Sequence, residues 1–281
     1  MSTDRWIELE GAVNVRELGG LPLRGGGTTR AGVLLRADTL QELTEADVEW
    51  LLAWGVRSVL DLRAPEEARR EGRGPLAEQP LAYANLAFIP DAVIVVDDPG
   101  HALVVAERNE QDRVEHYLDY LRGAGPAVVA ALEWLAGPAG VPAVFHCAAG
   151  KDRTGVLAAL VLDLNGVERE AVIADYARTN ERLDAVLGRL LRMPTYSHYT
   201  GTRRSTDLAC EPHVMEQFLA RLDAEHGGAA GWVRAAGMSE DSIARVSRLL
   251  HPATARPATA RPTADDDKGA GAAAVATAAS P

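Results

Sequence analysis

The sequence predicts an α/β fold in which a mostly parallel central sheet is flanked by helices on both faces and followed by a helical C-terminal part. Short apolar runs alternate with amphipathic segments along the first half of the chain, which is typical of strands and helices that alternate in a parallel sheet. The apolar run 141–145 leads through a polar loop into a second apolar run at 156–162, as expected for a strand, a loop and a helix. After residue 167 the apolar residues follow a helical spacing only.

The first elements are marked by signals at their ends. Residues 32–36 form a short expected strand. Thr44 is the expected N-cap of the first helix, because Asp47 follows three residues later and apolar residues at helical spacing come next. Gly55 is the expected end of that helix, since glycine accepts the left-handed conformation that ends many helices.

Two further strands, a short turn and two helices are expected before the polar loop. They are a strand at 56–62, an acidic turn at 65–68 that begins with Pro65, a strand at 83–88, and helices at 109–122 and 126–136. Five more helices are expected at 168–176, 179–192, 211–226, 228–236 and 239–250. In such sheets ligands bind beyond the carboxyl ends of the strands, so Asp61 and Cys147, which both follow strands, are expected to share one pocket.

Composition and charge exclude several classes of protein. The two cysteines, Cys147 and Cys210, do not form a disulfide framework and suit a reducing compartment. The formal net charge of −11 argues against nucleic acid as a partner. No apolar run reaches transmembrane length and the N-terminus has no apolar signal core, so we expect no stable membrane insertion and a cytoplasmic location, with leaderless secretion left open. The oligomeric state stays unknown.

The loop 146–155, His-Cys-Ala-Ala-Gly-Lys-Asp-Arg-Thr-Gly, is the strongest chemical signal in the chain. Cys147 lies between an expected strand and the N-terminus of an expected helix, where successive backbone N–H groups can converge on an anion and the thiolate form of cysteine is favoured. The planar guanidinium of Arg153 can bind two phosphate oxygens at once. The expected phosphate-binding residues are Ala148, Ala149, Gly150, Lys151, Asp152 and Arg153.

Other interpretations of this loop explain less of it. A buried structural cysteine is the plainest alternative, since free cysteine is often buried. A Walker-type nucleotide loop is excluded because Asp152 follows Gly150 and Lys151 and no glycine stands at the required upstream position. A papain-like protease would need a histidine from elsewhere in the fold and would leave Arg153 without a role.

The loop resembles the phosphate-binding loop of the protein-tyrosine phosphatase superfamily. Its Lys-Asp pair resembles the bacterial tyrosine/phosphoinositide phosphatases of the mycobacterial PtpB type. Three other segments agree with that group, at residues 14–20, 35–38 and 59–63, and the resemblance spans roughly residues 10–250. The resemblance implies a protein-tyrosine-phosphatase-like fold and a phosphatase that uses no metal or other cofactor.

Three residues of the loop are assigned roles in phosphoester hydrolysis. Cys147 is the expected nucleophile, attacking phosphorus in line. Arg153 and the loop N–H groups are expected to hold the equatorial oxygens of the phosphoryl group. Thr154 is expected to donate a hydrogen bond to the sulfur and to stabilise it as a leaving group. His146 is expected to fix the loop through a backbone hydrogen bond.

Two aspartates compete for the role of general acid, which must protonate the leaving oxygen. The resemblance favours Asp152, which lies within the loop. Asp61, at the end of a neighbouring strand, is the alternative acid, unless it forms an ion pair with Arg63 or Arg36.

The substrate is expected to be a phosphotyrosine protein or a phosphoinositide, with phosphoserine and phosphothreonine as further candidates. Lys151 adds positive charge beside the loop, which attracts phosphorylated substrates. Two alternatives from other classes are a phosphate-binding module without turnover and a rhodanese-like sulfurtransferase, which also carries a cysteine in a strand-to-helix loop. The Arg153-Thr154-Gly155 run five residues after Cys147 favours the phosphatase, because it fits a cradle of phosphate size.

One catalytic domain is expected at residues 1–251, followed by a disordered tail at 252–281 that is rich in alanine, proline and threonine. A helical lid is expected within about 179–226. The polar and aromatic connection 194–201 would contribute to that lid or form an ordinary surface loop.

Overall fold

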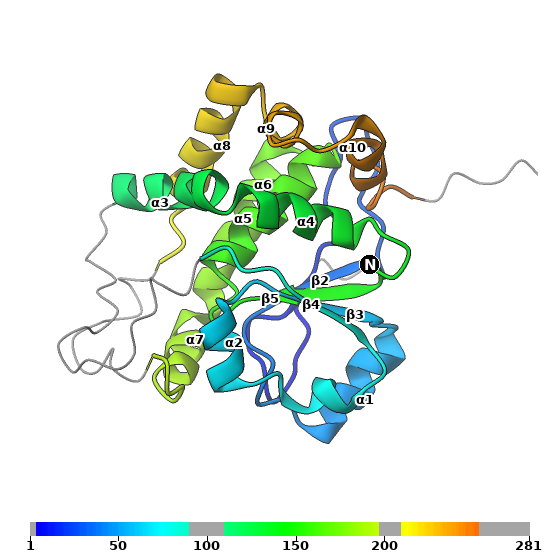
Figure 1. The fold of residues 1–281 in the computed structure, drawn as a ribbon, viewed down its shortest axis with the longest axis vertical. Helices are drawn as coiled ribbons and strands as arrows, with labels where there is room; N and C mark the ends of the chain where they lie inside the picture. The colour runs from blue at the N-terminus through cyan, green and yellow to red at the C-terminus, as the bar shows by residue number, and fades with distance from the viewer. Residues whose placement is uncertain (1–3, 90–109, 197–208, 253–281) are drawn as a thin grey trace, which may run out of the picture.

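A five-stranded sheet forms the centre of the computed structural model, which describes residues 4–89, 110–196 and 209–252 (Figure 1). The strands lie in the order β1-β2-β5-β3-β4. β1 is antiparallel to β2, and the other pairs are parallel. The bounds are Arg16–Glu17 for β1, Leu34–Ala37 for β2, Ser58–Asp61 for β3, Ala82–Asn85 for β4 and Ala143–His146 for β5.

Both faces of the sheet are covered, which confirms the predicted fold class. In β5, Phe145 packs into the larger of two apolar cores and Val144 into the smaller one, because successive side chains of a strand point to opposite faces. Figure 1 shows α3, α4, α5 and α6 on one side of the sheet and α1 and α2 on the other. The larger core also includes side chains from the C-terminal helices, so the helical part after the sheet belongs to the same folded unit.

The first helix before the loop has the ends that the sequence predicts, whereas the two short helices that follow it were not predicted as helices. Thr44 caps α1 (Glu45–Trp54) in a capping box with Asp47, and Gly55 ends the helix at φ 106°. The turn expected from Pro65 is a two-turn helix, α2 (Pro65–Glu71), and is followed by a short 3-10 helix, η1 (Gly74–Glu78). The two helices expected before β5 are α3 (Glu110–Gly123) and α4 (Gly125–Leu135).

After the loop, the secondary-structure elements of the described residues are all helices, joined by turns, with two differences from the prediction. The segment expected as one helix at 179–192 is divided into a 3-10 helix, η3 (Arg178–Arg182), and α7 (Leu183–Leu190). The last helix ends at Val246, and not near 250. The helices are α5 (Asp152–Leu164), α6 (Arg169–Ala177), α8 (Pro212–His226), α9 (Ala229–Ala235) and α10 (Glu240–Val246).

Some predictions fall partly outside the described residues. The expected tail lies outside the described residues from residue 253 onward. The connection 194–201 lies outside them from residue 197 onward. Within the described residues no helix is long and apolar enough to cross a membrane.

The register of the sheet places the site. His146 at the end of β5 pairs with Ala37 of β2 and with Asp61 of β3. The three strands therefore end level with one another, and the residues that follow them meet at one edge of the sheet. This is the shared edge that the sequence predicts for Asp61 and Cys147.

Candidate active site

The loop between β5 and α5 contains a glycine, Gly150, whose conformation and surroundings leave no room for a side chain. Gly150 has a φ of 65°, in the left-handed region that favours glycine. A Cβ at this position would lie 2.6 Å from the carbonyl oxygen of Ala37 and 2.6 Å from the amide nitrogen of Asp38. The loop therefore packs directly against the end of β2.

Three successive carbonyl groups of the loop are bound from outside. The backbone N–H of Thr39 donates to the oxygen of Ala148 over 3.1 Å. The side-chain amide of Asn14 donates to the oxygen of Ala149 over 2.9 Å, and Nη2 of Arg36 donates to the oxygen of Gly150 over 2.9 Å. Because the C=O and N–H of a trans peptide point in opposite directions, the N–H groups of these peptides face the inside of the loop. This is the arrangement that binds anions.

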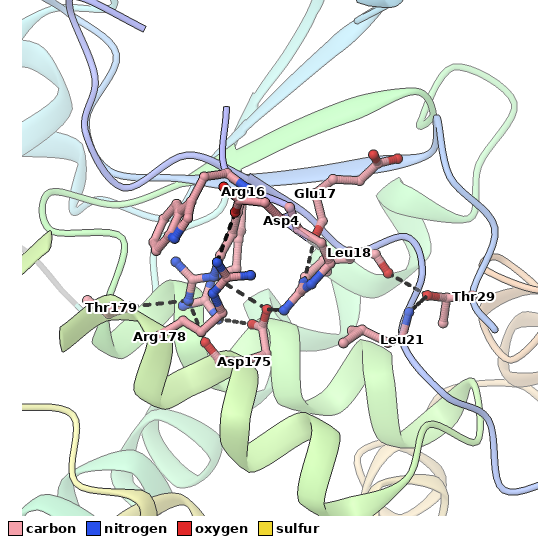
Figure 2. A network of polar contacts seen from close by, with 12 residues as sticks. Asp4, Arg16, Glu17, Leu18, Leu21, Thr29, Asp175, Arg178 and Thr179 are labelled. Atoms are coloured by element: carbon pink, nitrogen blue, oxygen red, sulfur yellow. Dashed lines mark hydrogen bonds and ion pairs between the residues drawn. The ribbon is translucent and has the colours of Figure 1, made fainter. Parts of the chain in front are cut away.

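Asp175 of α6 binds Arg36 directly and reaches Asn14 through Arg16. Figure 2 shows Asp175 and Arg16 in this network of polar contacts. The carboxylate of Asp175 lies 2.6 Å from Nη1 of Arg36, 2.8 Å from Nη2 of Arg5 and 3.4 Å from Nε of Arg16. Burial opposes ionisation of Asp175, but Arg16 and Arg36 outweigh it and lower the pKa of the carboxyl group. Arg16 also donates to the side chain of Asn14 over 2.5 Å. One buried carboxylate thus anchors both side chains that bind the loop.

Arg153 is buried beside Cys147 and is paired with Glu67 of α2. Nη1 of Arg153 lies 2.7 Å from Oε2 of Glu67, and Nη2 lies 3.3 Å from Oε1. Nη2 also contacts the hydroxyl of Tyr196 over 3.2 Å, and that hydroxyl donates to Glu67. Burial disfavours the charge on Arg153, but Glu67 outweighs it and raises the pKa of the guanidinium.

Asp152, the first residue of α5, is held by two donors on one of its oxygens. The hydroxyl of Tyr117 donates to Oδ1 over 2.7 Å, and Nζ of Lys151 lies 3.0 Å from the same atom. The side chain of Asp152 is 28% exposed, whereas that of Lys151 is 8% exposed. Burial acts to raise the pKa of Asp152, but Lys151 and Tyr117 outweigh it and hold the pKa at about 2.

Asp61 reaches the same edge of the sheet but is fully buried and paired. Arg63 binds it through Nε, at 3.0 and 3.1 Å from its two oxygens, and through Nη2 at 2.7 Å. The hydroxyl of Tyr83 donates to Oδ2 over 3.0 Å. Burial acts to raise the pKa of Asp61, but His146 and Arg63 outweigh it and lower the pKa to about 2. The ion pair with Arg63, which the sequence left open, is present.

His146 and Thr154 flank the nucleophile candidate. Nδ1 of His146 lies 3.1 Å from the carbonyl oxygen of Cys147, which agrees with the expected backbone hydrogen bond. The hydroxyl of Thr154 is buried and has no hydrogen-bond partner among the described residues, so the expected bond to Cys147 is not made in this structure. Cys147 itself is 2% exposed.

The structure thus brings all the predicted loop residues together and adds others that sequence reasoning did not assign. Asn14 and Arg36 lie in the segments that carried the family resemblance, and that was the available signal for them. Tyr196 lies in the connection 194–201 that the sequence offered as part of a lid, whereas Glu67 and Tyr117 had no signal, because only the fold brings them to the loop. Within the described residues no cluster of three or more histidine, cysteine or acidic side chains could hold a metal ion.

Comparison with known proteins decides the family. The model of a family described as "Tyrosine phosphatase family" matches residues 7–251. The chain belongs to this family. The expected enzyme class, a protein-tyrosine phosphatase, is confirmed by this match and by similar proteins that bear that name.

Three curated relatives support the assignment. The triple specificity protein phosphatase PtpB of Mycobacterium tuberculosis is 28% identical over 280 residues, which cover 86% of this chain and 98% of the relative. A tyrosine-protein phosphatase of Nostoc commune is 28% identical over 78% of this chain and 74% of the relative. A putative tyrosine-protein phosphatase of Cupriavidus necator is 31% identical over 60% of this chain and 61% of the relative.

Proposed function

We propose that this phosphatase hydrolyses phosphotyrosine through a phospho-cysteine intermediate on Cys147 and needs no metal ion. The observation that carries the proposal is the loop after β5, in which three carbonyl groups are bound from outside and Arg153 lies beside the cysteine. Such a loop presents N–H groups and a guanidinium to the three non-bridging oxygens of a phosphoryl group, where charge redistributes during transfer.

The reaction has two steps. In the first, the thiolate of Cys147 attacks phosphorus, the bond between phosphorus and the tyrosine oxygen breaks, and Asp152 gives its proton to that oxygen. In the second, Asp152 takes a proton from a water molecule whose oxygen attacks phosphorus. The sulfur–phosphorus bond then breaks, which releases phosphate and restores the thiolate.

Asp152 suits the acid role better than Asp61 does. Its side chain is 28% exposed, whereas Asp61 is fully buried and bound by Arg63 and Tyr83. The pKa of Asp152 is about 2 in the structure without substrate. A dianionic phosphoryl group bound next to Asp152 raises that pKa, because a nearby like charge disfavours ionisation of a carboxyl group. Substrate binding therefore shifts Asp152 toward the protonated form that an acid needs.

Lys151 and one relative support a substrate range that extends beyond phosphotyrosine. The triple specificity protein phosphatase PtpB is 28% identical to this chain over 98% of the relative's length and 86% of this chain. Lys151 is buried next to the loop and adds a positive charge there. We therefore include phosphoserine, phosphothreonine and phosphoinositide monoesters among the substrates, with phosphotyrosine as the reference substrate.

The first test traps the intermediate. Rapid quenching of the wild-type enzyme with p-nitrophenyl phosphate and mass spectrometry of its peptides should show phosphate on the peptide that carries Cys147. Cys147→Ser should lose nearly all turnover, by at least about 10⁴-fold, while it still binds vanadate or phosphate, because the anion cradle survives.

The control is the other cysteine, since Cys210→Ser should still form the adduct. EDTA should leave turnover unchanged. Turnover by Cys147→Ser above the level of contamination would refute the mechanism. Tight phosphate binding without turnover in the wild type would indicate a binding module. Sulfur transfer to cyanide would indicate a sulfurtransferase.

A further inference from the structure

Two tyrosine hydroxyls and a thiol are buried in succession behind Asp152. The hydroxyl of Tyr117 lies 2.7 Å from Oδ1 of Asp152 and 2.7 Å from the hydroxyl of Tyr176. The thiol of Cys210 is buried beside Tyr176 and interacts with it electrostatically. These residues come from α3, from α6 and from the segment before α8, and each is at most 1% exposed. Solvent therefore does not interrupt the series.

Counting protons fixes the direction of these hydrogen bonds. Burial raises the pKa of Tyr117, Tyr176 and Cys210, so all three keep their protons. Each has one proton to donate, and an ionised carboxylate can only accept. Tyr117 therefore donates its proton to Asp152, and Tyr176 donates to Tyr117. The whole series ends on one oxygen of Asp152.

That oxygen also receives the second donor. Nζ of Lys151 lies 3.0 Å from Oδ1, the same atom that Tyr117 binds. With Oδ1 occupied by two donors, Oδ2 is the oxygen on which a transferable proton can reside. We propose that Tyr117, supported by Tyr176, is a positioning residue that fixes Oδ1 of Asp152 and so presents Oδ2 to the leaving oxygen of the substrate. This inference rests on the proposed role of Asp152 as the acid.

Several groups face Asp152 and set its titration together. They are Lys151 in the loop, His116 and Tyr117 on α3, Tyr176 on α6 and Cys210 before α8, while Arg113 of α3 acts on Lys151. Of the uncharged groups, only Tyr117 makes a hydrogen bond to the carboxylate of Asp152 in the described residues. Removal of that hydroxyl is therefore a specific change that leaves every charge in place.

The test is the pH dependence of kcat with phosphotyrosine in Tyr117→Phe. A hydrogen bond to the carboxylate favours its ionised form, so its loss raises the pKa of Asp152 in the enzyme–substrate complex. The basic limb of the kcat profile should therefore move to higher pH by about one unit, the size expected for one hydrogen bond to a charged group. A misplaced acid should also lower kcat. The fall should be larger for phosphotyrosine than for p-nitrophenyl phosphate, because the poorer leaving group depends more on the acid.

Tyr83→Phe is the matched control. It also removes a hydroxyl that donates to an aspartate, but that aspartate is Asp61. The limb should stay in place in this variant. A limb that moves in Tyr83→Phe and not in Tyr117→Phe would overturn the inference and point to Asp61 as the acid.

A double variant separates failure of the inference from failure of the proposed function. In Asp152→Asn the basic limb should vanish, and Tyr117→Phe should then have no further effect on kcat. If the limb persists in Asp152→Asn, the acid assignment is wrong. If the limb vanishes there but does not move in Tyr117→Phe, the inference alone is wrong. Should Tyr117→Phe fail to fold by circular dichroism, Tyr176→Phe replaces it, with a smaller shift in the same direction supporting the inference and an unmoved limb refuting it.

Discussion

The guanidinium of Arg153 is balanced by a buried carboxylate before any substrate arrives. Glu67 is 1% exposed and binds both terminal nitrogens of Arg153. Breaking such a buried pair from one side leaves an uncompensated charge, which typically costs about 3–5 kcal/mol. A bound phosphoryl group brings negative charge to the same guanidinium. Glu67 therefore stabilises the empty loop and competes with the substrate for Arg153.

This competition predicts that Glu67→Gln makes stability depend on bound anions. The variant should melt at a lower temperature than the wild type in a buffer without phosphate, because Arg153 loses its counter-charge. Phosphate should raise its melting temperature by more than it raises that of the wild type, since the anion replaces the missing charge. Differential scanning calorimetry with and without phosphate measures both effects.

The control for this change is Glu66→Gln, one residue earlier in α2. Glu66 pairs with Arg69 at the surface, where ion pairs contribute little. Its melting temperature and its response to phosphate should match those of the wild type. Equal phosphate responses in Glu67→Gln and the wild type would show that Glu67 does not share Arg153 with the anion.

At the scale of elements, the loop between β5 and α5 is shaped by its contact with the end of β2. Gly150→Ala would place a methyl group 2.6 Å from the backbone of Ala37 and Asp38 and would strain a residue with a φ of 65°. The loop must move to accommodate it, and displacement of a catalytic group by about 1 Å can cost about 100-fold in rate. We therefore expect kcat/KM with p-nitrophenyl phosphate to fall by at least about 100-fold.

Gly188→Ala in α7 is the matched control for this prediction. A Cβ at Gly188 meets nothing within 4 Å, and alanine favours a helix over glycine. This variant should keep the activity of the wild type and be at least as stable. Nearly normal kcat/KM in Gly150→Ala would mean that the contact with β2 does not determine the shape of the loop.

The elements that sequence predicted correctly are those with local signals. The capping box of Thr44 and Asp47 and the left-handed Gly55 indicated both ends of α1 from residues in the helix or next to it. The apolar run before Cys147 and the glycine and arginine after it indicated the strand, the loop and the helix. β1 was not predicted, because its two residues, Arg16–Glu17, are too short and too polar to show a strand period.

The part of the site that sequence could not supply depends on long-range contacts. Glu67 and Arg153 are 86 residues apart, and Tyr117 and Asp152 are 35 apart. A carboxylate or a hydroxyl in an ordinary helix carries no mark of what it will face after folding. The segments that contain Asn14 and Arg36 carry the family resemblance. Only the structure shows which carbonyl groups these two side chains bind.

At the scale of the whole molecule, a group of buried cations lies around the loop of an acidic protein. The chain has 29 lysines and arginines against 40 aspartates and glutamates. Yet the residues that surround the loop include the buried cations Arg16, Arg36, Arg63, Lys151 and Arg153. Buried charges are screened less by salt than surface charges, so these cations can attract a phosphate dianion despite the net charge of the protein. The buried carboxylates that balance these cations link the site to the stability of the fold.

This link predicts that stability is lost in acid, with Asp61 as one identifiable contributor. The pKa of Asp61 is lowered to about 2 in the folded protein, where burial is outweighed by His146 and Arg63. A carboxyl group with a lowered folded pKa adds stability above its unfolded value, near about 4, and loses that stability as the pH falls toward its folded value. The contribution is about 2 kcal/mol. It should be fully present at neutral pH and decline between about pH 4 and pH 2.

Urea unfolding of the wild type and of Asp61→Asn at a series of pH values measures this contribution. Asp61→Asn should be less stable at neutral pH, because Arg63 loses its partner, and should lose less stability between about pH 4 and pH 2. His146 adds a separate loss of stability, because burial lowers its pKa in the folded protein. Stability therefore also declines as the pH falls below the pKa of histidine in the unfolded chain, about 6.5. Because this loss begins at a higher pH than the loss from Asp61, the two contributions can be measured separately. Parallel stability curves for the wild type and Asp61→Asn below about pH 4 would show that Asp61 titrates at its ordinary value in the folded protein.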